Sequence, residues 1–117
     1  MLAEGIIMSD DIKTYNKLVR DRIPDIIEED GKKCVVRYLK DDEYQQALDA
    51  KLDEELAEYH KDQSVEELAD LIEVIYAAAE ARGCTADELE IIRMKKLKKR
   101  GGFQKKVFLE TVYKESR

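Results

Sequence analysis

Residues 53–70 read DEELAEYHKDQSVEELAD, a stretch that carries eight carboxylates and one lysine. Ser64 and Glu67 within it form the capping-box pattern S-x-x-E, which is typical of a helix N-terminus. The residues before Ser64 continue the apolar spacing of an earlier helix, which Asp41 or Asp42 can cap. The stretch therefore predicts two consecutive helices that are joined by a tight turn.

The first of these helices, which reaches about residue 61, places two acids on its apolar side. Glu55 falls within an apolar stripe and Glu58 lies at its edge, whereas Glu54 points away. In the second helix, Glu67 and Asp70 share a side with apolar residues. Each helix therefore brings two carboxylates, three residues apart, onto a surface that is otherwise suited to burial. The apolar stripe of the first helix consists of Leu48, Leu52, Leu56 and Tyr59.

Four carboxylates on such a surface need a compensating positive charge. Desolvation of each ion costs several kcal/mol, and the four also repel one another. A divalent cation answers both problems, and oxygen ligands without His or Cys favour Mg²⁺, with Mn²⁺ as the next choice. A purely structural role stays open, because Lys51 can pair with Glu55 and Glu67 can serve the capping box. The expected Mg²⁺ ligands are Glu55, Glu58, Glu67 and Asp70.

Start and stop signals predict two further helices. Pro24 at a first helical position and Gly31 just past the end bracket a short helix. Gly83 ends the second long helix, and Thr85 and Glu88 repeat the capping box for a third long helix, which ends near KKRGG. We therefore expect three substantial helices and one short helix.

Two short segments rich in β-branched residues, KCVVRYL (33–39) and KKVFLETVY (105–113), read as antiparallel partner strands. The expected fold is mainly α: an antiparallel helical bundle with a small two-stranded β element. Residues 1–14 are interpreted as a flexible leader, and residues 15–117 as a single helical domain.

Composition excludes several classes of protein. Hydrophobic residues make up 44% and charged residues 41% of the 117-residue chain, which suits a helix-rich globular protein and argues against disorder. No segment has the charge-free length that a membrane span needs, and MLAEGIIMSDD lacks the basic region of a signal peptide. Cys34 and Cys84 match no metal or redox spacing. A cytoplasmic protein with reduced thiols and no membrane partner is expected.

The net charge of −6 discourages binding to a nucleic-acid polymer, but the charges are segregated along the chain. Residues 93–100 carry six cations and no acid, and residues 13–22 carry four cations and one acid. These segments are either solvated faces and mutual ion pairs, or a cradle for a polyphosphate beside the acidic stretch. The second reading predicts a polyphosphate-binding region beside a metal cluster.

Four blocks of the sequence resemble one known superfamily. ELAE (55–58) followed by ELAD (67–70) resembles the E-x-x-E…E-x-x-D signature of the all-α nucleoside triphosphate pyrophosphohydrolases, the MazG-like superfamily. YNKLVRDRIP (15–24) and RGGF (100–103) are similar to its phosphoribosyl-ATP-pyrophosphohydrolase-like branch. The resemblance extends over residues 15–109, which is nearly the whole chain.

This resemblance implies a Mg²⁺-dependent hydrolase that cleaves between the α and β phosphates of a nucleotide and releases a monophosphate and pyrophosphate. The resemblance also implies that the four acids of the two motifs are the metal ligands. Glu55 and Glu58 are the candidate catalytic residues. One of the four carboxylates can accept the proton of the attacking water instead of binding the metal directly; Glu55, with its apolar surroundings, is one candidate, and the sequence leaves this choice open. The candidate cations for the phosphate groups are Lys17, Arg20 and Arg22 near the N-terminus, and Lys96, Lys99 and Arg100 near the end of the third long helix.

Three alternatives stay open. Only eight residues separate Glu58 from Glu67, which leaves little material for a loop that recognises the base. The sequence therefore does not define the base or the sugar of the substrate. The chain is a nucleoside triphosphate pyrophosphohydrolase, a phosphoribosyl-ATP pyrophosphohydrolase, or a non-catalytic helical module that binds nucleotides or another partner.

The second long helix is apolar over most of its circumference, which predicts a homodimer or a dimer of dimers.

Overall fold

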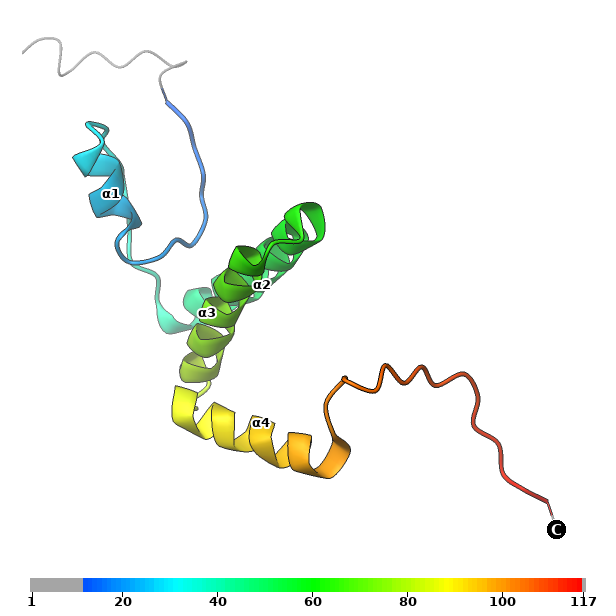
Figure 1. Ribbon diagram of the computed structural model, residues 1–117. Coiled ribbons are helices and arrows are strands. Elements are labelled where there is room, and N and C mark those ends of the chain that lie inside the picture. Colours follow the sequence, from blue (N-terminus) through cyan, green and yellow to red (C-terminus); the bar gives the residue numbers. More distant parts are fainter. Residues whose placement is uncertain (1–11, 117) are drawn as a thin grey trace, which may run out of the picture.

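The computed structural model describes residues 12–116, and the elements found in that range are helices (Figure 1). The chain order is α1 (Ile23–Glu29), α2 (Asp41–Asp62), α3 (Val65–Ala81) and α4 (Ala86–Arg100). The predicted mainly helical fold is therefore confirmed. None of these helices is long and apolar enough to cross a membrane.

The long helices begin and end where the local signals predict. Gln63 adopts the left-handed conformation (φ 53°) between α2 and α3, and the Ser64 side chain accepts a hydrogen bond from the first turn of α3. Gly83, at φ 80°, follows the end of α3, because a residue without Cβ takes this conformation at little cost. Thr85 and Glu88 form the complete capping box of α4, with both hydrogen bonds at 3.2 Å.

Helices α2 and α3 form an antiparallel hairpin, which is the centre of the molecule (Figure 1). Helix α4 contacts α3 and leaves the hairpin at an angle from the C-terminal end of α3, whereas α1 packs on none of the other helices. Within one chain, the expected antiparallel bundle is therefore limited to the α2–α3 pair.

The described part of the chain buries few side chains. Leu48, in the predicted apolar stripe of α2, and Val74 of α3 are its buried hydrophobic residues, at 2% and 9% exposure. Leu56 of the same stripe is 43% exposed. The radius of gyration is 21.3 Å, whereas a compact chain of this length has about 13 Å. A single copy is therefore extended and has a very small core.

The predicted β element is absent from the described residues, so this part of the prediction is wrong for the single chain. Residues 33–39 and 107–113 are free of helix and turn, whereas Lys105 lies in a turn, and the two segments lie on different sides of the helices (Figure 1). Each has the composition of a strand, yet a strand forms only when a partner lies alongside it. Of the predicted leader, residues 1–11 lie outside the described part, and the domain boundary at residue 15 stays a prediction.

Candidate metal centre

Five acids gather where α2 ends and α3 begins: Glu55, Glu58, Asp62, Glu67 and Asp70, called the acidic cluster below. Carboxylate oxygens of Glu55, Glu67 and Asp70 lie within 4.8 Å of one another. A second group with the same spacing joins Glu58, Asp62 and Glu67. All four acids predicted from the sequence are therefore in the cluster, and Glu67 belongs to both groups.

The position of Glu67 follows from the helix start. Its backbone N–H donates to the Ser64 hydroxyl at 3.3 Å, but its side chain does not complete the reciprocal bond that Glu88 makes in α4. The alternative in which the Glu67 carboxylate serves the capping box is therefore not realised. That carboxylate is directed to the acids of α2 instead.

The charges of the cluster oppose one another at Glu67. Its pKa is raised above the ordinary value of 4.5, first by desolvation and then by neighbouring negative charge. The negative charges are those of Asp70, Asp62, Glu55 and Glu58. A cation bound between these carboxylates would therefore stabilise the ionised form of Glu67.

Two lysines form ion pairs with acids of α2, one of which, Glu55, belongs to the acidic cluster. Lys51 Nζ lies 3.5 Å from Glu55 Oε1 and 3.3 Å from Glu54 Oε2, and Lys17 Nζ lies 2.9 Å from Glu54 Oε1. Desolvation alone would raise the pKa of Glu54, but the hydrogen bonds from Lys17 and Lys51 lower it below its ordinary value. The hydrogen bond to Glu54 likewise raises the pKa of Lys17. The Lys51–Glu55 pair expected from the i, i+4 spacing is therefore present.

Arg20 brings the N-terminal segment directly onto the acidic cluster. Its Nη2 lies 2.6 Å from Asp70 Oδ1, across fifty positions of sequence. The two side chains are 55% and 43% exposed, so the pair lies at the rim of the cluster and not beneath it. Lys17 and Arg20 are thus the predicted phosphate-binding residues that the fold places beside the acids.

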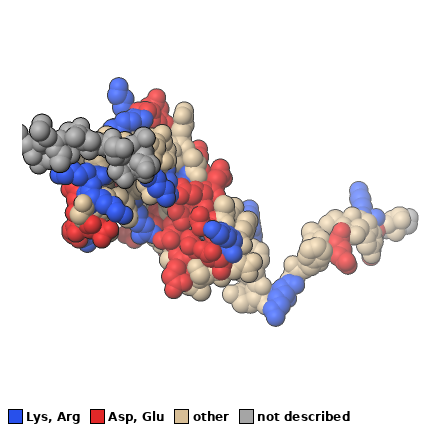
Figure 2. Space-filling view, turned by 90° about the horizontal axis from the view of Figure 1, so that it is seen from above, with Lys and Arg blue, Asp and Glu red and all other residues tan. Residues whose placement is uncertain are grey.

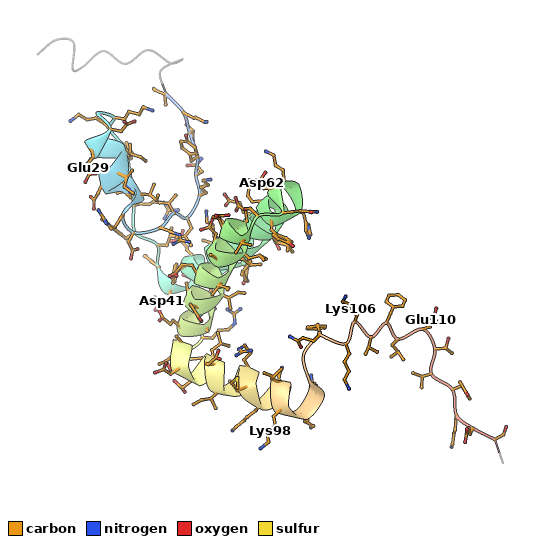
Figure 3. The ribbon with its side chains drawn as sticks, in the orientation of Figure 1. Glu29, Asp41, Asp62, Lys98, Lys106 and Glu110 are labelled. Carbon is orange, nitrogen blue, oxygen red and sulfur yellow. The ribbon has the colours of Figure 1, made fainter. Side chains whose placement is uncertain are left out.

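The other predicted cations lie elsewhere. Arg22 occupies the N-cap position of α1 without a side-chain capping bond and lines a shallow hollow with acids of that helix. Lys96, Lys99 and Arg100 are exposed in the last turns of α4. In Figure 3, Asp62 lies near the α2–α3 turn, whereas Lys98 lies on α4, beyond the opposite end of the hairpin. Within one chain, α4 therefore does not bring its cations to the acidic cluster, because it departs from the far end of α3.

Sequence reasoning missed two acids. Asp62 belongs to the second group, and its spacing of four residues from Glu58 was the available signal. Glu54 joins neither group, as the helical spacing indicated, but it binds the segment that carries Lys17. That contact had no local signal, because it depends on where residues 12–22 cross α2. Figure 2 shows the acidic side chains gathered on one face, with basic side chains beside them.

The raised pKa of Glu67 predicts how stability changes with pH. Ionised Glu67 opposes folding, so its penalty is absent well below pH 4.5 and develops as the pH rises through the raised pKa. We expect Glu67→Gln to raise the Tm of metal-free protein near neutral pH and to leave it unchanged in acid. Thermal unfolding in EDTA at both pH values measures this. A Tm that Glu67→Gln lowers near neutral pH would contradict the repulsion between the carboxylates.

Comparisons with known proteins do not assign the site. No family model matches the chain, and no solved structure matches it. An uncharacterised protein of Mycolicibacterium smegmatis is 64% identical to the chain over 42 residues. The match covers 36% of this chain and 43% of that protein, so the chain matches less than half of the relative's length. This similarity assigns no function to the acidic cluster.

Proposed function

We propose that the chain is a Mg²⁺-dependent nucleotide pyrophosphohydrolase that cleaves between the α and β phosphates of a nucleoside triphosphate. The observation that carries this proposal is the meeting of acids from two helices, with carboxylate oxygens of Glu55, Glu67 and Asp70 within 4.8 Å. The same acids are those that the resemblance to the MazG-like superfamily implies as ligands. Cys34 and Cys84 are free thiols, which supports a cytoplasmic location.

The donor set fits magnesium. Around an octahedral Mg²⁺ with oxygens at about 2.1 Å, adjacent ligands lie about 3 Å apart and opposite ligands about 4.2 Å apart. The carboxylate oxygens of each group lie within 4.8 Å, so small side-chain rotations bring them to ligand distance. The two groups share Glu67, so the residues that would hold a divalent cation are Glu55, Glu67 and Asp70, or Glu58, Asp62 and Glu67. Hard oxygen donors also suit Mn²⁺.

The chain's own residues supply the remaining parts of the chemistry. Bound magnesium would neutralise the polyphosphate and activate a water for attack on phosphorus. Arg20, at the rim, is placed to exchange its bond with Asp70 for one with a phosphate oxygen, which a guanidinium binds in a fork geometry. Where Glu55 does not bind the metal directly, its carboxylate, which is only 13% exposed and lies 3.5 Å from Lys51 Nζ, would accept the proton of the attacking water.

Pyrophosphate release from a panel of NTPs and dNTPs, with Mg²⁺, Mn²⁺ or EDTA, tests the proposal. We expect release that depends on the metal and stops in EDTA, and the panel then names the preferred base and sugar. Phosphoribosyl-ATP is included as a separate substrate, because pyrophosphate release from it alone would identify the chain as a phosphoribosyl-ATP pyrophosphohydrolase. Absence of release from all substrates with either metal would contradict the enzyme proposal.

The ion pairs of the cluster favour a second candidate, a non-catalytic binding module. Arg20 and Lys51 neutralise Asp70 and Glu55 without a metal, as a purely structural cluster requires. In that case the protein binds its partner in EDTA as well as in Mg²⁺, and its thermal stability does not respond to the metal.

Arg20→Gln separates the two candidates. In the enzyme, Arg20 competes with the metal for Asp70, so we expect the variant to bind Mn²⁺ up to about fivefold more tightly, which is the upper range for an exposed ion pair. Turnover falls, because a phosphate ligand is lost. Calorimetric titration with Mn²⁺ measures the affinity. Unchanged Mn²⁺ affinity together with a lowered Tm would assign Arg20 a structural role. Lys13→Gln, on the same segment and outside the ion pairs of the cluster, is the control.

A further inference from the structure

The C-terminal arm, residues 103–113, carries exposed apolar side chains that no other part of residues 12–116 covers. It leaves α4 after Arg100 and runs away from the helices (Figure 1). Its aromatic residues Phe103, Phe108 and Tyr113 are 95%, 86% and 78% exposed. In this conformation the arm does not bury these side chains against its own helices, and exposed aromatic side chains gathered on one segment indicate an interaction site.

A second segment of the same chain has the same properties. Residues 33–39, between α1 and α2, are extended, and Val35 and Tyr38 are 102% and 92% exposed. Among the described residues, neither 33–39 nor 107–113 makes a backbone hydrogen bond. Both segments therefore present unpaired N–H and C=O groups along a β-branched and aromatic sequence, which is the usual template for strand addition.

The exposed area is larger than a lone chain of this size should have. The chain exposes 11455 Å², whereas a compact monomer of 13.6 kDa exposes roughly 6,600 Å². Residues 1–11, which lie outside the described part, can contribute at most about 1,700 Å² to the excess. The remainder exceeds the area of about 1,000 to 2,500 Å² that each chain contributes to a large obligate dimer.

The outer face of α3 adds a packing surface. Ile72, Ile75 and Tyr76 follow the i, i+3, i+4 spacing of one helix face and are 48%, 39% and 38% exposed. The other face of α3 packs on α2 and contains the buried Val74. An apolar helix face of this kind requires a further layer.

We propose that a second copy of the chain covers these surfaces, with the C-terminal arm of each copy pairing with residues 33–39 of the other. In a two-fold arrangement each copy offers one arm and accepts one arm, so all four unpaired segments are used and the assembly closes. The chain carries both halves of the interface, whereas a different partner would have to supply two strands and an apolar face. The two-stranded element that the sequence predicts then forms between copies instead of within one.

The mass in solution tests the dimer. Sedimentation of the full chain at micromolar concentration should give twice the 13.6 kDa of one chain, or an even multiple. Because the association buries most of the core, the Tm should rise with protein concentration. A monomeric mass, or a Tm independent of concentration, would overturn the proposal. Neither readout depends on catalysis, so this test and that of the proposed function fail separately.

A pair of substitutions tests the arm. Phe108→Asp should lower the mass to that of one chain, or raise the dissociation constant at least tenfold, whereas Phe108→Leu, which keeps an apolar side chain, should leave the dimer intact. Circular dichroism accompanies both measurements. A loss of helix in Phe108→Asp alone also supports the proposal, since Phe108 lies on an arm directed away from its own helices. A dimer in which Phe108→Asp changes neither mass nor helix content would overturn the arm exchange.

Discussion

Glu67→Gln is expected to lower metal-dependent pyrophosphate release by about a hundredfold or more. Glu67 is the acid that both groups of the acidic cluster share, so its loss affects every ligand set available there. The amide keeps the size of the side chain, and the N-terminal hydrogen bond of α3 is made by the backbone and is retained. Initial rates with saturating Mg²⁺ measure the effect.

Glu66→Gln is the matched control. Glu66 is the neighbouring residue of the same helix turn, is exposed, and belongs to neither group of the cluster. Its removal changes the net charge by the same amount and should change the rate less than about twofold. Equal losses in both variants would show that general charge, and not the position of Glu67, governs the activity.

Leu48→Ala should reduce the free energy of unfolding by about 2 to 5 kcal/mol, the usual range for a buried leucine. Leu48 is 2% exposed and lies in the α2–α3 hairpin, where the structure has very few other buried side chains. A cavity at this position therefore removes much of the core that one chain forms by itself. Urea unfolding at a fixed protein concentration measures the change.

Leu48→Met provides the comparison, because it conserves volume and should cost less than about 1.5 kcal/mol. If Leu48→Ala cost no more than Leu48→Met, the centre of the hairpin would not be the core. Both variants keep the acidic cluster unchanged, so their metal-binding stoichiometry should remain that of the parent protein.

Helix positions were predictable because their signals are local. Ser64 and Thr85 begin α3 and α4 at the expected residues, since a cap depends on hydrogen bonds within one turn. The pairing of strands is not local. Residues 33–39 and 105–113 have the right composition, yet composition cannot say whether the partner strand belongs to the same copy.

The acidic part of the candidate site was predictable for the same reason. Three-residue spacing within each helix and a short turn between helices bring Glu55 and Glu58 to Glu67 and Asp70, whatever the rest of the chain does. The basic part was predictable only in part. Arg20 reaches the cluster, whereas the cations of α4 do not, because the angle between α3 and α4 depends on packing that no local pattern encodes.

Titration with Mn²⁺, followed by electron paramagnetic resonance, shows whether the acidic cluster binds a divalent cation. We expect saturable binding by the parent protein and by Glu66→Gln, displacement by Mg²⁺, and an affinity at least about tenfold weaker in Glu67→Gln. Absence of saturable binding, or an equal affinity in Glu67→Gln and the parent, would contradict metal binding by the cluster.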